Sequence, residues 1–211
     1  YKKIDDFIFY YKRFAHEGED VSAYGLVQIE QAVNGIEAFV YGAELQAQYK
    51  MDFLPGFLSN FGIYTNYTFT HSEAYIGQRI SANNADAVVI FNDDNFQLYD
   101  ATGDREKITL PGQAKHAANI ALFYETEKIY TKISANYHDA FLYELGADKD
   151  LDVYYDEAWH LDFTVNYGIT SNLKVFVDVI NLTNAPLKFY LGKPDQNMQQ
   201  EFYSWWGRLG L

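Results

Sequence analysis

The 211-residue sequence contains no cysteine, which excludes a disulfide scaffold, a CxxC redox motif and a cysteine-ligated metal site. It also lacks any uninterrupted run of 18 apolar residues, which excludes helical transmembrane spans. Basic residues are few: 16 Lys and Arg stand against 29 Asp and Glu and are spread along the chain, which argues against a nucleic-acid partner. Aromatic residues are abundant, with 19 Tyr, 16 Phe and 3 Trp. A chain this rich in apolar side chains must bury them and is not a disordered acidic tail.

Several segments alternate apolar and polar residues with the two-residue period of a β-strand. The clearest are 39–51, 61–70 and 159–167, in which the odd positions are mostly apolar and the even positions mostly polar. Weaker alternation occurs in 4–14, 114–124, 129–143, 173–183 and 201–211. The sequence therefore predicts an all-β chain of about eight strands.

The lengths of these strands and of their connections favour a membrane barrel. Several strands span about ten to fifteen residues, and a tilted strand needs about 9–11 residues to cross a bilayer. Tight turns at 52–56, 125–127 and 170–172 alternate with long links at 15–35, 72–112, 144–153 and 184–200. This pattern predicts an antiparallel transmembrane β-barrel, with a soluble β-sandwich as the alternative.

The alternation also predicts which side chains meet lipid and which face the barrel interior. We expect the apolar positions to face lipid, namely Tyr41, Leu45, Phe61, Ile63, Leu161, Phe163 and Val165. We expect the polar positions to point inward, namely Glu44, Gln46, Gln48, Lys50, Asn66, Lys132, Asn136, His160, Asp162 and Asn166. Aromatic residues near strand ends suit the two interfacial girdles of such barrels, namely Tyr49, Tyr124, Tyr130, Tyr155 and Tyr167.

Three motifs resemble those of a known family. The run Asn181-Leu182-Thr183-Asn184 is similar to an Asn-Leu-x-Asp/Asn run near the family's C-terminus. Residues 110–116 are similar to a Pro-Lys-His motif at the start of a late strand, with Ala114 where the family has proline, and 206–211 are similar to the start of the closing strand. From about residue 36 onward the chain resembles the C-terminal part of the β-barrel of TonB-dependent outer-membrane receptors, particularly those of the Bacteroidetes type.

The resemblance implies a barrel of about 22 strands with a plugged lumen. Residues 1–211 would then be a C-terminal segment of about eight strands, with the plug and the earlier strands outside this chain. The short turns would be periplasmic and the long loops extracellular. The implied partners are outer-membrane lipid and TonB, the latter through an upstream segment. Whether a surface lipoprotein takes part stays open.

The implied function is active import of a scarce nutrient across the outer membrane of a Gram-negative bacterium, with energy coupled through TonB. The resemblance leaves ferric siderophore, cobalamin, heme, glycan and peptide open as substrates. The alternative is a stand-alone eight-stranded barrel with a binding or structural role. That alternative requires segment 4–14 to pair with segment 201–211, whereas a receptor wall predicts no ladder between them and a curved open sheet.

Catalytic, metal and ligand sites are weakly marked in the sequence. No catalytic motif is present and the five histidines are scattered, so we predict neither an enzyme nor a cofactor. Asp148, Asp150 and Asp152 alternate as in a calcium loop, but Val153 stands where an EF-hand needs glycine, which favours a solvated loop over a metal site. Acidic and aromatic residues mix in the predicted loop 72–112, and its candidate ligand contacts are Tyr75, Asp93, Asp94, Phe96 and Tyr99.

Overall fold

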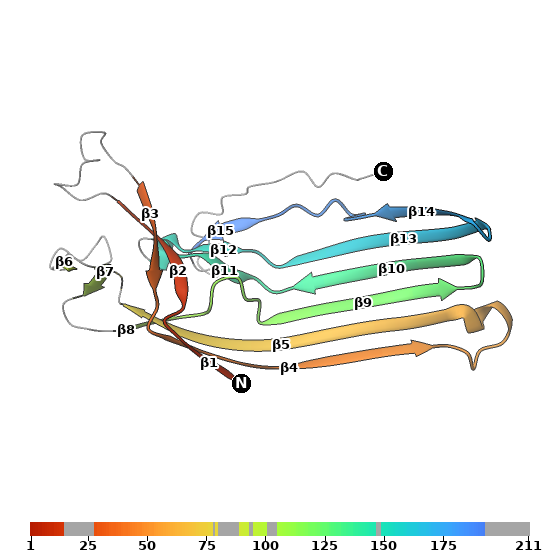
Figure 1. Ribbon diagram of the computed structural model, residues 1–211, viewed down its shortest axis with the longest axis horizontal. Coiled ribbons are helices and arrows are strands. Elements are labelled where there is room, and N and C mark those ends of the chain that lie inside the picture. Colours follow the sequence, from red (N-terminus) through yellow and green to blue (C-terminus); the bar gives the residue numbers. More distant parts are fainter. Residues whose placement is uncertain are drawn as a thin grey trace.

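The computed structural model of the chain describes residues 1–14, 28–77, 79, 89–92, 95–100, 105–146 and 149–192. Regular structure in these ranges consists of β-strands and two short 3₁₀ helices (Figure 1). None of the helices found there is long and apolar enough to cross a membrane.

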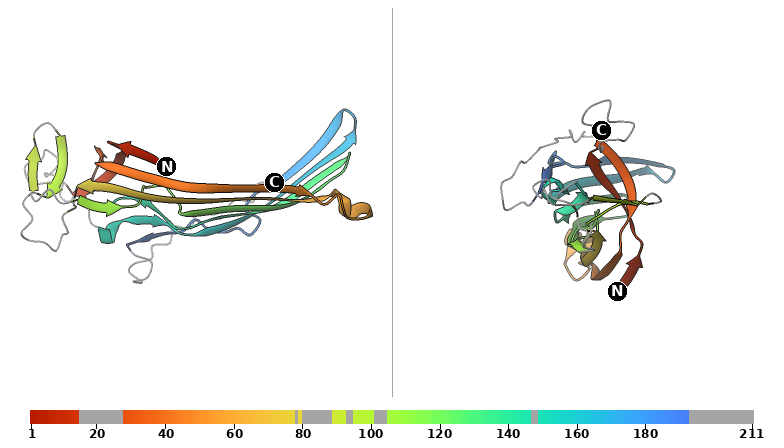
Figure 2. Two further views of the ribbon diagram at one scale, coloured as in Figure 1. Left: turned by 90° about the horizontal axis from the view of Figure 1, so that it is seen from below. Right: turned by 90° about the vertical axis from the view of Figure 1, so that its left-hand side faces the viewer.

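One large antiparallel sheet dominates the structure. Its strands lie in the order β1-β4-β5-β9-β10-β13-β14, and β8 pairs with the last four residues of β5. Figure 2 shows the long strands as a single curved layer. The all-β antiparallel architecture is thereby confirmed. The strand bounds are β1 (Lys2–Asp5), β4 (Glu37–Lys50), β5 (Phe61–Gly77), β8 (Arg105–Ile108), β9 (His116–Glu125), β10 (Ile129–His138), β13 (Ala158–Thr170) and β14 (Leu173–Val179).

The connections at one end of the sheet are short, as predicted, and we call this the turn end. Residues 126–128 join β9 to β10, and residues 171–172 join β13 to β14. The link between β4 and β5 contains the 3₁₀ helix η2 (Gly56–Asn60), and Gly56 there has a positive φ of 61°, which glycine adopts without strain. In the 126–128 turn the Thr126 hydroxyl accepts a hydrogen bond from the Ile129 amide at 3.1 Å. The opposite end is the loop end.

The loop end contains more regular structure than the sequence predicts. The expected loop 72–112 begins too early, because β5 continues to Gly77 in a ladder with β4 and β8. Further short strands lie in the expected links: β6 (Val89–Asn92) pairs with β7 (Asn95–Asp100). The strands β11 (Phe141–Glu144), β12 (Val153–Tyr155) and β15 (Phe189–Leu191) form a separate three-stranded sheet, and the 3₁₀ helix η3 (Lys149–Leu151) precedes β12.

The predicted first strand, 4–14, is broken at Asp6. This residue has a positive φ of 55°, so the chain turns away from the wall after β1. The following strand β2 (Ile8–Phe14) pairs with β3 (Gln28–Asn34) instead of continuing β1. The Gly35 amide donates to the Phe7 carbonyl at 2.6 Å, and a Cβ on Gly35 would lie 2.2 Å from the Phe7 ring. A glycine is therefore required where β3 meets this break.

Two other predicted strands end earlier than expected. The segment 129–143 ends its first ladder at His138 and resumes as β11. The segment 173–183 ends at Val179, shortly before Asn181, whose φ of 54° is incompatible with an extended strand. The predicted segment 201–211 lies outside the described residues.

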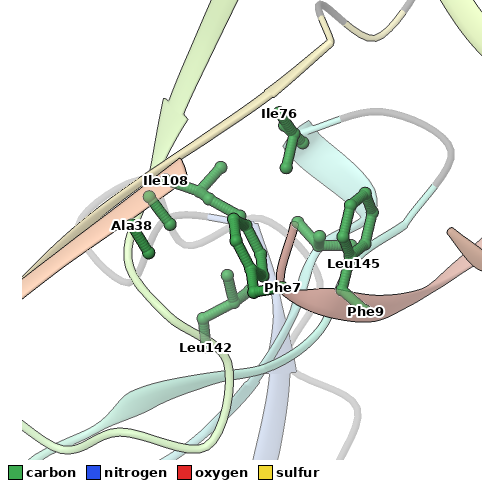
Figure 3. Close-up of a cluster of buried hydrophobic side chains, with 8 residues drawn as sticks. Phe7, Phe9, Ala38, Ile76, Ile108, Leu142 and Leu145 are labelled. Carbon is green, nitrogen blue, oxygen red and sulfur yellow. The ribbon is translucent and has the colours of Figure 1, made fainter. Parts of the chain in front are cut away.

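The buried hydrophobic core lies at the loop end rather than in the middle of the sheet. Figure 3 shows Phe7, Ile108 and Leu142 close together, with Ile76, Phe9 and Leu145 beside them. These side chains come from the β1–β2 junction, β2, β5, β8 and the β11 region. Ala38 of β4 and Ala74 of β5 complete the cluster on the sheet itself. The core therefore anchors the short loop-end segments onto one face of the large sheet.

The large sheet is open in the described part of the chain. Its edges are β1 and β14, and no ladder among the described residues joins them. The described residues thus form the curved open wall that is expected of a receptor segment. The pairing expected for a small closed barrel would involve 201–211, which lies outside them.

Candidate functional site

The strand register separates the large sheet into two chemically different faces. Leu45 lies opposite Tyr67, Ile63 opposite Leu122, and Leu122 opposite Ile133. We define the outer face as the odd positions of β4, β5, β10, β13 and β14 together with the even positions of β9, and the inner face as the alternate positions. All the residues predicted to meet lipid lie on the outer face: Tyr41, Leu45, Phe61, Ile63, Leu161, Phe163 and Val165.

The outer face exposes an unusually large amount of apolar surface. Leu45 is 69% exposed and Trp159 58%. Smaller contributions come from every long strand, namely Tyr41, Tyr49, Tyr67, Ile120, Leu122, Ile133, Tyr167, Val175 and Val177. A contiguous exposed apolar surface of this kind indicates contact with a membrane or a partner, and its strand-by-strand repetition fits the lipid side of a barrel.

Aromatic side chains border this apolar surface at both ends. At the turn end, Phe61 and Tyr124 pack edge to face with ring centroids 4.9 Å apart. Near the loop end, Tyr137 packs against Trp159 at 4.6 Å, and the Tyr67 hydroxyl hydrogen-bonds His116 Nδ1 at 2.7 Å. Two bands of amphipathic rings are the expected girdles of a membrane barrel.

Of the five residues predicted for the girdles, three lie on the outer face and two do not. Tyr49, Tyr124 and Tyr167 lie on the outer face toward the turn end. Tyr130 lies on the inner face, where its ring stacks on Phe123, because it occupies an even position of β10. Tyr155 belongs to β12 of the small sheet, where its ring contacts His138.

Charged side chains replace apolar ones on the outer face toward the loop end. Glu37 of β4 accepts from Lys3 at 3.2 Å and from Arg105 at 3.0 Å, and Glu73 of β5 accepts from Lys107 at 2.5 Å. The hydrogen bond from Lys107, with a smaller one from His71, holds the pKa of Glu73 below its ordinary value. These exposed ion pairs indicate the level at which the outer face leaves the hydrocarbon layer.

The inner face is mostly polar, with the exposed Phe176 of β14 as an apolar exception. Part of this face forms a hydrogen-bonded chain across strands. Asn119 Nδ2 donates to Asn136 Oδ1 at 2.5 Å, and Asn136 Nδ2 donates to Asp162 Oδ2 at 2.8 Å. On the neighbouring strands Asn66 Nδ2 donates to Glu44 Oε1 at 2.6 Å. The residues predicted to point inward share this face: Glu44, Gln46, Gln48, Lys50, Asn66, Lys132, Asn136, His160, Asp162 and Asn166.

The Asn181 motif extends this inner chain beyond β14. The Asn181 amide donates to Asp162 Oδ1 at 2.8 Å, so Asp162 links Asn136 to the motif. The Asn181 side chain makes two hydrogen bonds to the Ala185 backbone, at 2.8 and 2.9 Å. Asparagine suits this position because it tolerates a positive φ and its amide can satisfy a backbone donor and acceptor together.

Replacing Asn181 with alanine should therefore destabilise this part of the wall. Two side-chain hydrogen bonds are lost, each contributing about 0.5–1.5 kcal/mol, so the expected cost is about 1–3 kcal/mol. Asn184→Ala is the matched control, because Asn184 also has a positive φ (51°) but has no side-chain hydrogen bond among the described residues. Denaturant unfolding of the full-length receptor measures both, and equal effects would refute the role assigned to the Asn181 side chain.

A buried arginine joins three segments at the loop end. The Arg79 side chain is 4% exposed and contacts two carboxylates. It donates to Glu106 Oε2 at 3.0 Å, to Asp152 Oδ2 at 3.0 Å and to the Gly146 carbonyl at 3.1 Å. Asp152 also accepts from the Gly146 amide at 2.9 Å. We call these four residues the Arg79 clamp.

The electrostatics of the clamp keep the arginine charged. Burial alone would lower the pKa of the Arg79 guanidinium, but the hydrogen bonds that it donates to Glu106 and Asp152 outweigh this effect and raise that pKa above its ordinary value. All the guanidinium nitrogens have acceptors. No sequence motif marks this cluster, because Arg79 is 27 residues from Glu106 and 73 residues from Asp152.

Of the five predicted ligand contacts, the structure describes Tyr75, Phe96 and Tyr99. Tyr75 lies in β5 on the outer face, opposite Glu37 and Lys107, rather than in a loop. Phe96 and Tyr99 lie in β7, which pairs with β6 and also lies against β5, the strand that contains Tyr75. Asp93 and Asp94 lie outside the described residues. Their role in ligand binding stays a prediction.

Of the candidate calcium ligands, Asp152 has an arginine as its partner. Both carboxylate oxygens of Asp152 accept hydrogen bonds from Arg79, so a metal ion there would have to displace the guanidinium. Asp150 lies in η3, and Asp148 lies outside the described residues. Elsewhere in the described ranges no group of three or more His, Asp and Glu side chains could hold a metal ion.

A curved antiparallel wall with an apolar, aromatic-bordered outer face and a polar inner face defines the class of protein as a membrane β-barrel. A family model described as TonB dependent receptor-like, beta-barrel matches residues 1–182. The chain therefore belongs to the TonB-dependent receptor family, which confirms the resemblance in the sequence. The matched range includes all strands from β1 to β14. A search of curated proteins finds no match.

Membership places the chain among proteins of the Gram-negative outer membrane that act with TonB. The members of this family are transporters and not enzymes. The chain is accordingly assigned to the outer-membrane TonB-dependent transporters as a class.

Proposed function

We propose that the protein imports a scarce nutrient across the outer membrane, with energy supplied through TonB. The observation that carries the proposal is the two-faced wall: an apolar outer face suited to lipid and a polar inner face suited to a lumen. Family membership supports the same conclusion.

We also propose that residues 1–211 form the C-terminal segment of a larger barrel. The open edges at β1 and β14 support this, because an unpaired strand edge cannot satisfy its backbone hydrogen bonds in lipid. Neighbouring strands from elsewhere in the full-length protein would pair with these edges. The plug and the TonB-contacting segment would lie upstream.

The substrate class stays open among ferric siderophore, cobalamin, heme, glycan and peptide. Ligand contacts are proposed at the loop end, around Asp93, Asp94, Phe96 and Tyr99. Tyr75 is the weakest of the predicted contacts, because its position on the outer face of β5 directs it away from a ligand entering the lumen. A surface lipoprotein that delivers the ligand would have to contact the same end.

Uptake in the presence and absence of TonB tests the transport proposal. Cells that produce the full-length receptor should bind ligand with or without TonB but accumulate it only when TonB and the proton gradient are present. Uptake that persists unchanged in a TonB-deficient strain would remove the active-transport assignment and favour a passive barrel. Chemical conversion of the ligand by the purified protein would instead indicate an enzyme.

A further inference from the structure

The connection between β4 and β5 exposes large apolar side chains at the turn end. Phe53 is 68% exposed and Phe57 67%, and Leu58 is exposed beside them. Residues 53–60 contain no charged side chain, although they lie beyond the last residue of β4. We call residues 52–60 the apolar turn.

The other two turns at the same end of the large sheet are polar. One has the sequence Thr-Glu-Lys at 126–128, and the other has Ser-Asn at 171–172. Side chains of this kind are expected where a tight turn lies in water. Apolar side chains gathered on a surface instead mark contact with a membrane or a partner, so the apolar turn has different surroundings from its two neighbours.

The apolar turn has a defined backbone. The Leu54 amide donates to the Met51 carbonyl at 3.0 Å, and the Met51 amide donates to the Phe61 carbonyl at 2.8 Å. Gly56 begins η2, and its carbonyl accepts a hydrogen bond from the Ser59 hydroxyl at 2.7 Å. Figure 2 shows the coil of η2 at the turn end of β4 and β5. None of the η2 residues is buried, so this helix presents its apolar side chains outward.

Both ends of the apolar turn contact tyrosines of the turn-end girdle. The Phe53 ring packs against the Tyr49 ring with centroids 6.2 Å apart. At the other end, Asn60 Nδ2 donates to the Tyr124 hydroxyl at 3.4 Å. Tyr49 and Tyr124 lie on the outer face. The apolar turn therefore continues the apolar outer surface past the strand ends, at the level where girdle rings meet lipid headgroups.

We propose that the apolar turn is a membrane anchor whose Phe53, Phe57 and Leu58 side chains lie among phospholipids, at the boundary between acyl chains and headgroups. The leaflet is the inner one, given the periplasmic position that the family resemblance implies for the short turns. Lipid fits better than a protein partner because the apolar turn is continuous with the lipid-facing outer face. Residues 53–60 carry no charge, so the anchor depends on apolar contact and not on anionic headgroups. The wall is thus held in the inner leaflet on its β4–β5 side, while the other two turns lie in water.

Spin labels on the three turns of the full-length receptor test the anchor, once any other cysteine has been replaced. A label at Leu58→Cys leaves Phe53 and Phe57 in place. In phosphatidylcholine vesicles this label should collide mainly with dissolved oxygen, which concentrates in lipid. Labels at Glu127→Cys and Ser171→Cys should collide mainly with a water-soluble nickel chelate. The ratio of oxygen to nickel collisions should be severalfold higher at position 58, and adding salt or phosphatidylglycerol should leave it unchanged.

Two further variants test the phenylalanines themselves. Replacing Phe53 and Phe57 together by serine should lower the ratio at position 58 severalfold, because the turn then loses most of its apolar surface. Phe176→Ser is the matched control, since Phe176 is 71% exposed but lies on the inner face of β14, and it should leave the ratio at position 58 unchanged.

Three results would overturn the proposal. A ratio at position 58 equal to that at position 127 would place the apolar turn in water. Protection of position 58 from both oxygen and the nickel chelate would show that a protein surface, from another segment or a second copy, covers the turn. An unchanged ratio in the double serine variant would show that the phenylalanines do not hold the turn in lipid. None of these readouts depends on TonB, so the import proposal fails or stands separately.

Discussion

Replacing Arg79 with leucine is expected to destabilise the loop end by about 3–5 kcal/mol, because the change leaves carboxylates buried without their counter-charge. Asp152 is most affected, since its side chain is 5% exposed and both of its oxygens bond Arg79. The core beside Ile76, Ile108 and Leu145 should then open as a local unit. Hydrogen exchange of the β8 and β11 amides in the full-length receptor measures this loss.

The matched control for this prediction is Arg105→Leu. Arg105 also pairs with a glutamate, but its side chain is 54% exposed, so its loss should cost less than about 1 kcal/mol. A triple change of Arg79→Leu, Glu106→Gln and Asp152→Asn should recover most of the stability, since no charge is then left buried. If Arg79→Leu and Arg105→Leu behave alike, the clamp does not hold the loop-end segments together.

Replacing Leu161 with arginine should destabilise the barrel by about 2–4 kcal/mol if the outer face meets the middle of the bilayer. Leu161 lies on β13 between Trp159 and Phe163, within the apolar surface. A guanidinium at this level would have to leave water or deform the bilayer. Guanidine unfolding of the full-length receptor in lipid vesicles gives the free-energy change.

Asn166→Arg is the control on the same strand, because Asn166 lies on the inner face opposite Tyr130. Facing a polar lumen, arginine at this position should change stability by less than about 1 kcal/mol. Equal losses in the two variants would show that the faces are not distinguished by lipid contact. A larger loss for Asn166→Arg would show that the assignment of the faces is reversed.

The faces of the wall could be predicted from the sequence because the strand period is short and regular. In β13, apolar and polar residues alternate from Trp159 to Tyr167, and one register then fixes which side each residue occupies. The turn end was also predictable, since tight turns carry local signals such as Gly56 and Thr126. These features depend on neighbouring residues only.

The loop end could not be predicted because its structure depends on long-range contacts. The chain turns out of the large sheet at Asp6, and the next residue, Phe7, packs in a core that includes Leu142 and Ile108. This turn therefore depends on residues far away in the sequence. The Arg79 clamp likewise joins residues that sequence proximity does not connect. Asp152 illustrates the difficulty. Its place among alternating aspartates suggests a metal ligand, but its carboxylate pairs with the guanidinium of Arg79 from another segment.

The most direct test of the account is the environment of successive residues along β13 in the full-length receptor. Residues 1–211 contain no cysteine. Single cysteines at positions 159–167 can therefore each carry a spin label once any cysteine elsewhere in the full-length receptor has been replaced. In lipid vesicles, labels at odd positions such as Leu161, Phe163 and Val165 should collide mainly with dissolved oxygen. Labels at even positions such as Asp162 and Thr164 should not show this preference, which gives an alternation with a period of two. Equal accessibility to oxygen at odd and even positions, or the opposite alternation, would contradict a wall whose outer face meets lipid.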